Sequence, residues 1–301
     1  MTKTLIILTG PTAIGKSRIA VNIAKRLKTE IISADSRQIY RELSIGTAVP
    51  SKKELTSIKH HFIHSHSIFQ NYNAFIYETE VLQLINKLFE KYDSLLMAGG
   101  SMLYIDAVCK GIDIMPDADP EIRKNLQSVH IREGLEGLRM QLKQLDPVYY
   151  EKTDLKNPAR IIHALEICLT SGKPYSSFRS DLPVGRPFEI LKIGINSDRK
   201  ALHHNINRRV DEMINAGLEK EAKAVYKYKS LNALNTVGYR EFFHYFDKKI
   251  SKEKTIELIK RNTRRYARKQ ITWFRNDPKV HWFQPEKEEN ILTFINNNID
   301  D

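Results

Sequence analysis

A phosphate-binding loop near the start of the chain is the feature with the clearest chemical meaning. The pattern Gly10-x-x-x-x-Gly15-Lys16-Ser17 lets the backbone curl so that several N–H groups point at one oxyanion. A helix that begins there adds partial positive charge, Lys16 adds a full charge, and the Ser17 hydroxyl suits a Mg²⁺ ion. The predicted phosphate site consists of Gly10, Pro11, Thr12, Ala13, Ile14, Gly15, Lys16 and Ser17. The pattern does not specify which phosphate compound binds.

Polar residues follow two further predicted strands, residues 30–34 and 94–98. The first strand runs into Asp35, Ser36, Arg37 and Gln38, and the second into Gly99, Gly100 and Ser101. Ligands bind at the carboxyl ends of strands in open parallel sheets, so Asp35 and Ser101 are candidates for chemistry in one crevice. The alternative for Asp35 is a helix cap, and spacing alone leaves both interpretations open.

The long helix predicted for residues 254–276 is the strongest basic feature. Seven basic residues and no acidic residue lie between Lys260 and Arg275. Three- and four-residue spacing places four arginines on one face, namely Arg261, Arg264, Arg265 and Arg268. A solvated helix face normally mixes charge signs, so this face favours contact with a phosphate backbone. We expect the interleaved Trp273 and Phe274 to belong to the core.

These features are positioned by alternating strands and helices. Apolar residues at helical spacing follow the phosphate loop, and a second helical pattern covers residues 75–92. Together with strands 5–9, 30–34 and 94–98, this alternation predicts an α/β fold: a phosphate-loop NTPase-like core with a parallel sheet. Further strands are expected at residues 188–195 and 280–283, whereas residues 41–73 look irregular.

A change of periodicity interrupts this core. Residues 113–187 have helical periodicity, so we predict a helical insertion domain there and a core domain made of residues 1–112 and 188–301. Arg123, Arg160 and His163 are the notable polar residues of the insertion. From the sequence alone, ordinary helix surface is favoured over a binding role for all three.

Composition sets the broad class of the protein. The 301 residues are 41% hydrophobic and 28% charged, which is typical of a globular protein with a sizeable core. The net charge of +12 indicates a polyanionic partner, usually a nucleic acid. No stretch reaches the apolar length of a membrane span, and the chain leads directly into the first strand without a signal peptide. We therefore expect a cytoplasmic protein with no membrane partner.

Cysteine and histidine do not indicate a metal site. Cys109 and Cys168 match no metal-ligand spacing and lie in apolar helical patterns, so buried thiols are expected. Four histidines lie between residues 60 and 66, but no cysteine or acidic ligand accompanies them. A solvated loop with one or two packed imidazoles is favoured over a zinc site.

Several motifs together resemble those of the bacterial tRNA dimethylallyltransferases, also called tRNA isopentenyltransferases. Besides the phosphate loop, they are Asp35-Ser36-Arg37-Gln38-Ile39-Tyr40, Ile45-Gly46-Thr47-Ala48, Gly99-Gly100-Ser101-Met102-Leu103-Tyr104, Asn157-Pro158-Ala159-Arg160, Val237-Gly238-Tyr239-Arg240 and Arg268-Lys269-Gln270-Ile271-Thr272-Trp273-Phe274-Arg275. They span nearly the whole chain in family order. The phosphate loop occurs in many families, whereas the block beginning at Asp35 and the final block are far more specific.

The resemblance implies a reaction and a site. The family transfers the dimethylallyl group of dimethylallyl diphosphate to N6 of adenosine 37 in the anticodon loop of tRNAs that read codons beginning with U. Asp35 would then be the general base, and Ser101 stands where the family usually has a threonine that orients the reacting centre. Lys16, Ser17, Mg²⁺ and Arg209 would hold the diphosphate. The tRNA would contact Asp35, Ser36, Arg37, Gln38, Ser101, Arg123, Ala159, Arg160, Ile161, Ile162, His163, Val237, Gly238, Tyr239, Arg240, Arg268, Lys269, Gln270, Ile271, Thr272, Trp273, Phe274 and Arg275.

The chain departs from the family pattern at four positions. Ile14 and Ser17 stand where serine and threonine are common, which leaves phosphate binding by the backbone unaffected. Ala159 and His163 replace a usual glutamine and arginine in the tRNA-contacting stretch.

Two other function classes use the same loop: a nucleotide or small-molecule kinase, and a non-catalytic GTPase-like RNA-binding module. The kinase does not explain the one-signed basic helix, and no guanine-specificity motif is visible. We expect a monomer.

Overall fold

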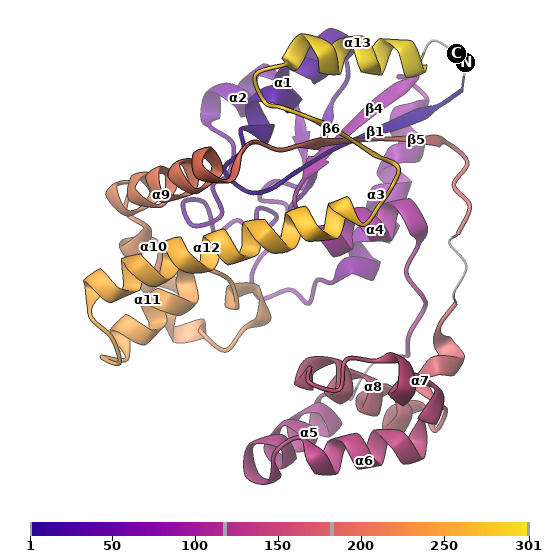
Figure 1. Ribbon diagram of the computed structural model, residues 1–301, viewed down its shortest axis with the longest axis vertical. Helices are drawn as coiled ribbons and strands as arrows, with labels where there is room; N and C mark the ends of the chain where they lie inside the picture. Colours follow the sequence, from indigo (N-terminus) through magenta and orange to yellow (C-terminus); the bar gives the residue numbers. More distant parts are fainter. Residues whose placement is uncertain (1, 117–118, 181–183, 300–301) are drawn as a thin grey trace. The chain divides into compact units, whose positions relative to one another are not determined.

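The computed structural model describes residues 2–116, 119–180 and 184–299. In this part of the chain, six parallel strands form one sheet in the order β3-β2-β4-β1-β5-β6 (Figure 1). The strands are β1 (Thr4–Thr9), β2 (Ile31–Ala34), β3 (His60–His61), β4 (Ser94–Gly99), β5 (Glu189–Ile195) and β6 (Val280–Phe283). The predicted α/β fold with a parallel sheet is confirmed.

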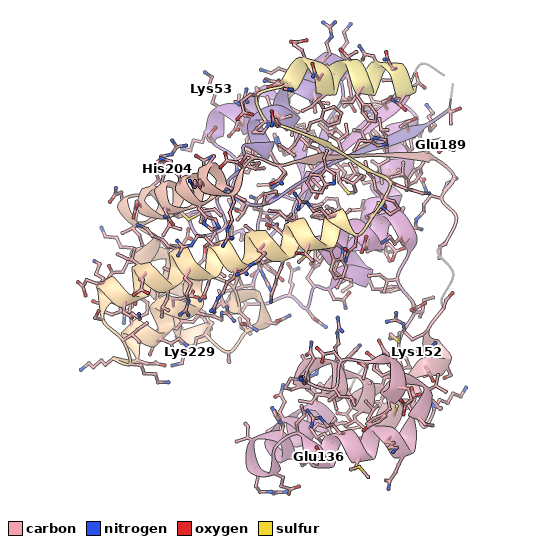
Figure 2. All side chains as sticks on the ribbon, viewed as in Figure 1. Lys53, Glu136, Lys152, Glu189, His204 and Lys229 are labelled. Atoms are coloured by element: carbon pink, nitrogen blue, oxygen red, sulfur yellow. The ribbon has the colours of Figure 1, made fainter. Side chains whose placement is uncertain are left out.

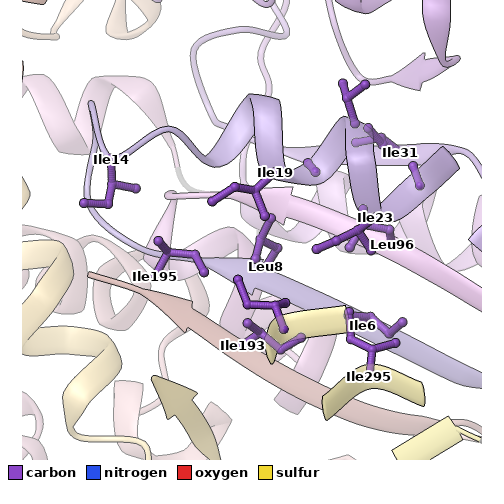
Figure 3. Close-up of a cluster of buried hydrophobic side chains, with 14 of the residues drawn as sticks. Ile6, Leu8, Ile14, Ile19, Ile23, Ile31, Leu96, Ile193, Ile195 and Ile295 are labelled. Atoms are coloured by element: carbon purple, nitrogen blue, oxygen red, sulfur yellow. The ribbon is translucent and has the colours of Figure 1, made fainter. Parts of the chain in front are cut away.

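The apolar character of β1 explains its central place. All six of its residues are buried, because β4 pairs with one edge, β5 with the other, and helices cover both faces. Ile6 and Leu8 point to the face that carries α1 (Lys16–Leu27) and α13 (Glu288–Ile299), where they pack with Ile19, Ile23 and Ile295 (Figure 3). Continuous burial on both faces is typical of a parallel strand.

Other helices complete the core unit. Figure 1 shows α3 (Ala74–Phe89) and α4 (Met102–Lys110) on the face of the sheet opposite α1 and α13. The remaining helices are α2 (Lys52–Ser57), α9 (Arg199–Asn215), α10 (Leu218–Val225), α11 (Tyr239–Phe246) and α12 (Lys252–Arg275). The last of these packs against α9, α11 and α4, so one long helix links these three. Charged side chains such as Lys53, His204 and Lys229 lie on the outer surface (Figure 2).

The structure divides into two compact units, residues 1–110 with 185–301 and residues 111–184. The second unit corresponds to the insertion expected at 113–187. It begins two residues earlier and ends three residues earlier than expected. It contains α5 (Pro120–Glu133), α6 (Glu136–Leu145), α7 (Pro147–Lys152) and α8 (Pro158–Ser171). Leu142, Ile161 and Leu165 are fully buried in its own apolar core. Both cysteines are free and buried, as predicted.

Two expectations about regular structure were wrong. Residues 41–73 contain α2 and β3, but α2 has no buried residue and β3 has only two residues, so neither produces a readable hydrophobic period. The helix α13 was not predicted, although its Ile291 and Ile295 are fully buried against the sheet.

Among the described residues, no group of histidine, cysteine or acidic side chains is arranged to hold a metal ion. None of the described helices is long and apolar enough to cross a membrane.

The Gly99→Ala substitution tests the close approach of β4 to β2. A Cβ at Gly99 would lie 2.1 Å from the carbonyl oxygen of Ala34, so the two strands would have to separate. We expect the free energy of unfolding to fall by about 1–3 kcal/mol, measured by urea denaturation. Gly185→Ala is the control, because it lies in the same unit and nothing lies within 4 Å of its added Cβ. Equal stability of the two variants would contradict this account.

Candidate active site

The phosphate loop joins β1 to α1 in a conformation that glycine makes possible. Gly10 has a φ of +146°, and a Cβ there would lie 2.4 Å from the carbonyl oxygen of Ile195. Gly15, with a φ of +94°, is the N-terminal cap of α1 and provides no side chain to satisfy the first turn. The N–H groups at this helix end are therefore available to an anion, and the helix dipole favours negative charge there.

Two cations lie beside this loop. The Lys16 Nζ donates to the carbonyl oxygens of Gly10 and Pro11, both at 2.8 Å. Arg209 comes from α9 and bonds the hydroxyl of Thr12 and the carbonyl of Ala48, both at 3.4 Å. Lys16 and Arg209 both line a cavity of about 400 Å³ that follows the loop. A polyanionic ligand would bind between them.

Burial lowers the pKa of both cations, and charge repulsion adds to the effect at Lys16. The pKa of Lys16 is lowered to about 7, chiefly by burial and also by the nearby Arg209 charge, while Asp35 opposes the change. Burial also lowers the pKa of Arg209, while Asp35 and Glu212 oppose that shift. An anion in the cavity would favour the charged form of both groups, because it brings opposite charge to them.

Asp35 lies at the carboxyl end of β2 and closes a tight turn. Its Oδ1 accepts from the backbone N–H groups of Arg37 (2.9 Å) and Gln38 (3.2 Å). No helix begins at this turn, so the helix-cap alternative was wrong. Its second oxygen, Oδ2, has no hydrogen-bond partner in the described part of the chain. The carboxylate is therefore held in place by one oxygen and can accept a proton or a hydrogen bond with the other.

Ser101 is fixed directly beside this turn. Its Oγ accepts from the Ser36 N–H at 2.8 Å and donates to the Ser36 hydroxyl at 3.2 Å. The Ser101 N–H donates to the carbonyl of Ala34 at 3.1 Å, which ties the turn after β4 to the end of β2. Tyr266 of α12 lines the same crevice, and burial and the Asp35 charge raise the pKa of this tyrosine to about 12. Tyr266 therefore stays a neutral phenol beside the reacting crevice.

A second cavity, of about 320 Å³, lies on the other side of Asp35. Its walls include the turn at residues 35–37, the segment 46–48 and residues 235–238. The two cavities share six lining residues, Thr12, Asp35, Thr47, Ala48, Arg209 and Tyr266. Asp35 and Arg209 therefore stand where a phosphate cradle meets a separate compartment large enough for a planar group.

One residue of this site, Glu221 of α10, was not predicted. Its carboxylate accepts from the backbone N–H groups of Ser44, Ile45 and Gly46 at 2.8–3.0 Å and from the Tyr239 hydroxyl at 2.5 Å. These bonds hold the segment 44–48, whose carbonyls at Thr47 and Ala48 in turn bind the amide of Gln38. A glutamate on an amphipathic helix resembles any solvated charge, so the sequence contains no signal for this role.

Comparisons with known proteins identify this architecture. The family model described as IPP transferase matches residues 38–277. The chain belongs to the IPP transferase family. It is 50% identical over 293 residues to a Bacteroides fragilis protein named tRNA dimethylallyltransferase 1, with 97% of each chain covered. A Porphyromonas gingivalis protein of the same name is also 50% identical, over 97% of this chain and 98% of its own. The sequence-based resemblance is therefore confirmed.

A solved structure agrees with this assignment. The tRNA isopentenylpyrophosphate transferase of Bacillus halodurans is 32% identical and superposes with a TM-score of 0.73, covering 99% of this chain and 97% of that one. The fold is thus shared over nearly the whole chain.

The segment 268–275 of this IPP transferase divides between two faces of α12. Arg268, Lys269, Thr272 and Arg275 are exposed, whereas Gln270 and Phe274 are buried and Ile271 is partly buried. Trp273 is 41% exposed and donates from Nε1 to Asp106 at 2.9 Å, so the expectation of a core tryptophan was wrong. The reason is its neighbour on α4: a carboxylate gives the indole N–H a partner at the surface.

The segment 237–240 lies beside the second cavity. Val237, Gly238 and Arg240 line it, whereas Tyr239 is fully buried with its ring against Gly46. Arg37 closes another part of the same wall by donating to the carbonyls of residues 232 and 233 at 3.2 Å.

The remaining predicted contact residues lie in the helical unit. Ala159 and Arg160 are exposed at the start of α8, while Ile161 and Ile162 fill that unit's core. His163 lies 3.6 Å from Glu166, and Arg123 pairs with the same carboxylate at 2.5 Å. Arg160 alone among these basic groups has no ion partner in the described residues. Arg123 is 49% exposed, so part of its side chain is open to a partner, while its guanidinium pairs with the buried Glu166.

Ser17 could contribute to a magnesium site. It lines the cavity beside the phosphate loop, and oxygen atoms are the ligands that Mg²⁺ prefers. No three acidic, histidine or cysteine side chains of the described chain are grouped to hold an ion alone. The residues therefore fit an ion that takes its other ligands from a diphosphate and water, as Mg²⁺ commonly does.

Donor binding should take up a proton at Lys16. At about pH 8.5 a lysine whose pKa is about 7 is mostly neutral, and an approaching diphosphate favours the charged form. We expect uptake of nearly one proton and an affinity that falls about tenfold per pH unit above 7. Calorimetry in buffers of different ionisation enthalpy measures the proton number. Lys16→Met is the control and should show no uptake. Binding by the native protein without proton uptake would contradict the expectation.

Proposed function

We propose that the protein transfers the dimethylallyl group of dimethylallyl diphosphate to N6 of adenosine 37 in tRNAs that read codons beginning with U. The products are N6-(dimethylallyl)adenosine and diphosphate. The observation that carries the proposal is the position of Asp35 and Arg209, which line both the cavity of the phosphate loop and the second cavity. The names of relatives that are 50% identical over nearly the whole chain support it.

The phosphate loop would stabilise the leaving group. As the bond between the allylic carbon and the diphosphate oxygen breaks, negative charge grows on the diphosphate. Lys16, Arg209 and the N–H groups at the start of α1 are already positioned around that charge. A bound Mg²⁺, held through Ser17, would add a further positive charge. The cavity is partly enclosed by protein, so each of these interactions is stronger than it would be in water.

Asp35 would act as the general base late in the reaction. The exocyclic amine of adenine is a poor nucleophile, because its lone pair is delocalised into the ring, so the allylic carbon must gain positive character before attack. A carboxylate is too weak a base to deprotonate that amine beforehand. Once the new C–N bond makes the nitrogen acidic, the unpaired Oδ2 can accept its proton. Ser101, fixed by Ser36, would orient the reacting nitrogen.

The second cavity would receive the adenine base. An unpaired nucleotide of an anticodon loop leaves its stack at low cost, and proteins commonly read such bases in a pocket. Ser36, Arg37 and Gln38 lie at or beside that pocket. The Ser101 hydroxyl holds Ser36, and carbonyls of neighbouring segments hold Arg37 and Gln38. The exposed cations of α12 and the Arg160 surface of the helical unit would bind the tRNA backbone. We propose that the enzyme acts in the cytoplasm, where it would meet its tRNA substrate. We also propose that it acts as a monomer.

ATP would bind only as a competitor of the prenyl donor. A phosphate loop binds a diphosphate through backbone N–H groups and its lysine, and these groups do not read what is attached beyond it. A kinase must instead place an acceptor oxygen against a terminal phosphorus. In the proposed reaction Asp35 and Ser101 would instead flank an allylic carbon, so ATP should inhibit without being consumed.

The direct test is tRNA-dependent release of diphosphate from the prenyl donor, run beside phosphate release from ATP. We expect prenylated adenosine in the tRNA and no ATP turnover. Asp35→Asn should lower the single-turnover rate by about 10²–10⁴, the usual contribution of a general base, and leave tRNA affinity within a few-fold. ATP turnover without prenylated adenosine would overturn the transferase and favour the kinase. A near-normal rate of the asparagine variant would remove Asp35 from the mechanism.

Salt dependence tests the tRNA surface. Arg265, Arg268 and Lys269 are exposed and have no ion partner among the described residues, so replacing all three by alanine should remove phosphate contacts. Each lost contact should flatten the plot of log affinity against log salt concentration by roughly 0.7–0.9. The control replaces three exposed cations of α1 and α3 with the same change of charge: Lys25, Arg26 and Lys87. Equal slopes for the two triple variants would show that α12 carries only a solvated face.

A further inference from the structure

A buried amide interrupts the apolar face of α12. This face carries Ile259, Ala267 and Phe274, all less than 5% exposed, and Gln270 lies among them at 2% exposure. A buried amide must find hydrogen-bond partners or it destabilises the fold. Gln270 finds both of its partners outside the helix, in two segments of the candidate active site.

The two partners belong to opposite sides of the crevice. The Gln270 Oε1 accepts from the backbone N–H of Thr12 in the phosphate loop at 2.9 Å. Its Nε2 donates to the carbonyl oxygen of Gly100 at 2.8 Å. Thr12 is the loop residue whose hydroxyl meets Arg209, and Gly100 directly precedes Ser101. One planar amide group therefore sets the separation between the diphosphate cradle and the turn that carries Ser101.

The contact leaves no free space at this point. A Cβ on Gly100 would lie 2.3 Å from Gln270 Nε2 and 3.5 Å from the carbonyl oxygen of Gly10. Gly100 must therefore be a glycine for the amide, the phosphate loop and the turn to meet. The Thr12 N–H is occupied by this bond, so the loop offers its other N–H groups to an anion.

The side chain of Gln270 points away from the arginine face of α12. Residues of an α-helix follow each other at about 100°, so Gln270 and Arg268 point about 200° apart. The arginine face is thus on the opposite side of α12 from Gln270, which is buried. The family resemblance had placed Gln270 with the tRNA contacts, whereas its side chain bonds only Thr12 and Gly100 among the described residues.

We infer that Gln270 is a positioning residue of the transfer reaction, which holds the phosphate loop and the Gly100–Ser101 turn at their working distance. This inference rests on the proposed transferase function. Losing the amide would let the departing diphosphate and the accepting side of the crevice move relative to each other. Misplacement of reacting groups by about 1 Å can cost on the order of a hundredfold in rate.

The test compares Gln270→Met with Thr255→Val. Methionine has a similar length and no amide, so both bonds are lost while the volume is kept. Thr255 is fully buried on the same helix, 15 residues away, and its hydroxyl donates to Ser251 at 2.9 Å, so valine removes a buried hydrogen bond far from the site. We expect Gln270→Met to lower kcat ten- to a hundredfold, with the KM for tRNA within twofold of the native value, and Thr255→Val to leave kcat unchanged. Unchanged kcat in Gln270→Met, or an equal loss in both variants, would overturn the inference.

Amide hydrogen exchange separates this inference from the proposed function. The Thr12 N–H should exchange at least tenfold faster in Gln270→Met and at the native rate in Thr255→Val, with or without inorganic diphosphate as the probe. This measurement needs no turnover, so it stands even if the native protein does not prenylate tRNA. Unaltered exchange at Thr12 in Gln270→Met would overturn the positioning role by itself.

Discussion

Two like charges gathered at one cavity impose the main constraint on this structure. Lys16 and Arg209 repel each other in a partly buried place, and burial lowers the pKa of both. Asp35 is the one carboxylate that opposes both shifts, so positive charge remains in excess. A ligand with several negative charges would relieve this excess. The cavity therefore favours a polyanionic ligand.

Close backbone approach at the carboxyl edge of the sheet makes this gathering possible. Gly10 lies against Ile195 and Gly99 against Ala34, with no room for a Cβ at either glycine. The ends of β1, β2 and β4 consequently lie near one another. The phosphate loop, Asp35 and Ser101 each follow one of these three strand ends, so the sheet brings the loop, the carboxylate and the hydroxyl together.

The helix α12 serves both sides of the site. Its outer face presents arginines and lysine to solvent, while Tyr266 lines both cavities and Gln270, four residues later, bonds Thr12 and Gly100. A single rigid element therefore links the surface proposed for tRNA to the groups proposed for chemistry. Glu221 has a comparable role from α10, since it holds the segment 44–48 that forms a wall shared by both cavities.

The sequence by itself determined the phosphate loop, the parallel sheet, the family and the one-signed basic helix. Each depends on a pattern complete within one or a few neighbouring elements, such as the loop motif from Gly10 to Ser17. Only the tertiary structure decided the roles of Gln270 and Glu221. The partners of Gln270 lie 258 and 170 residues away in the sequence, and Ser44, a partner of Glu221, lies 177 residues away. The tertiary structure also decided that Trp273 reaches the surface, since Asp106 of α4 provides its partner. Local periodicity reports which face of an element is apolar, whereas the partner of a buried polar group depends on which distant segments the fold brings together.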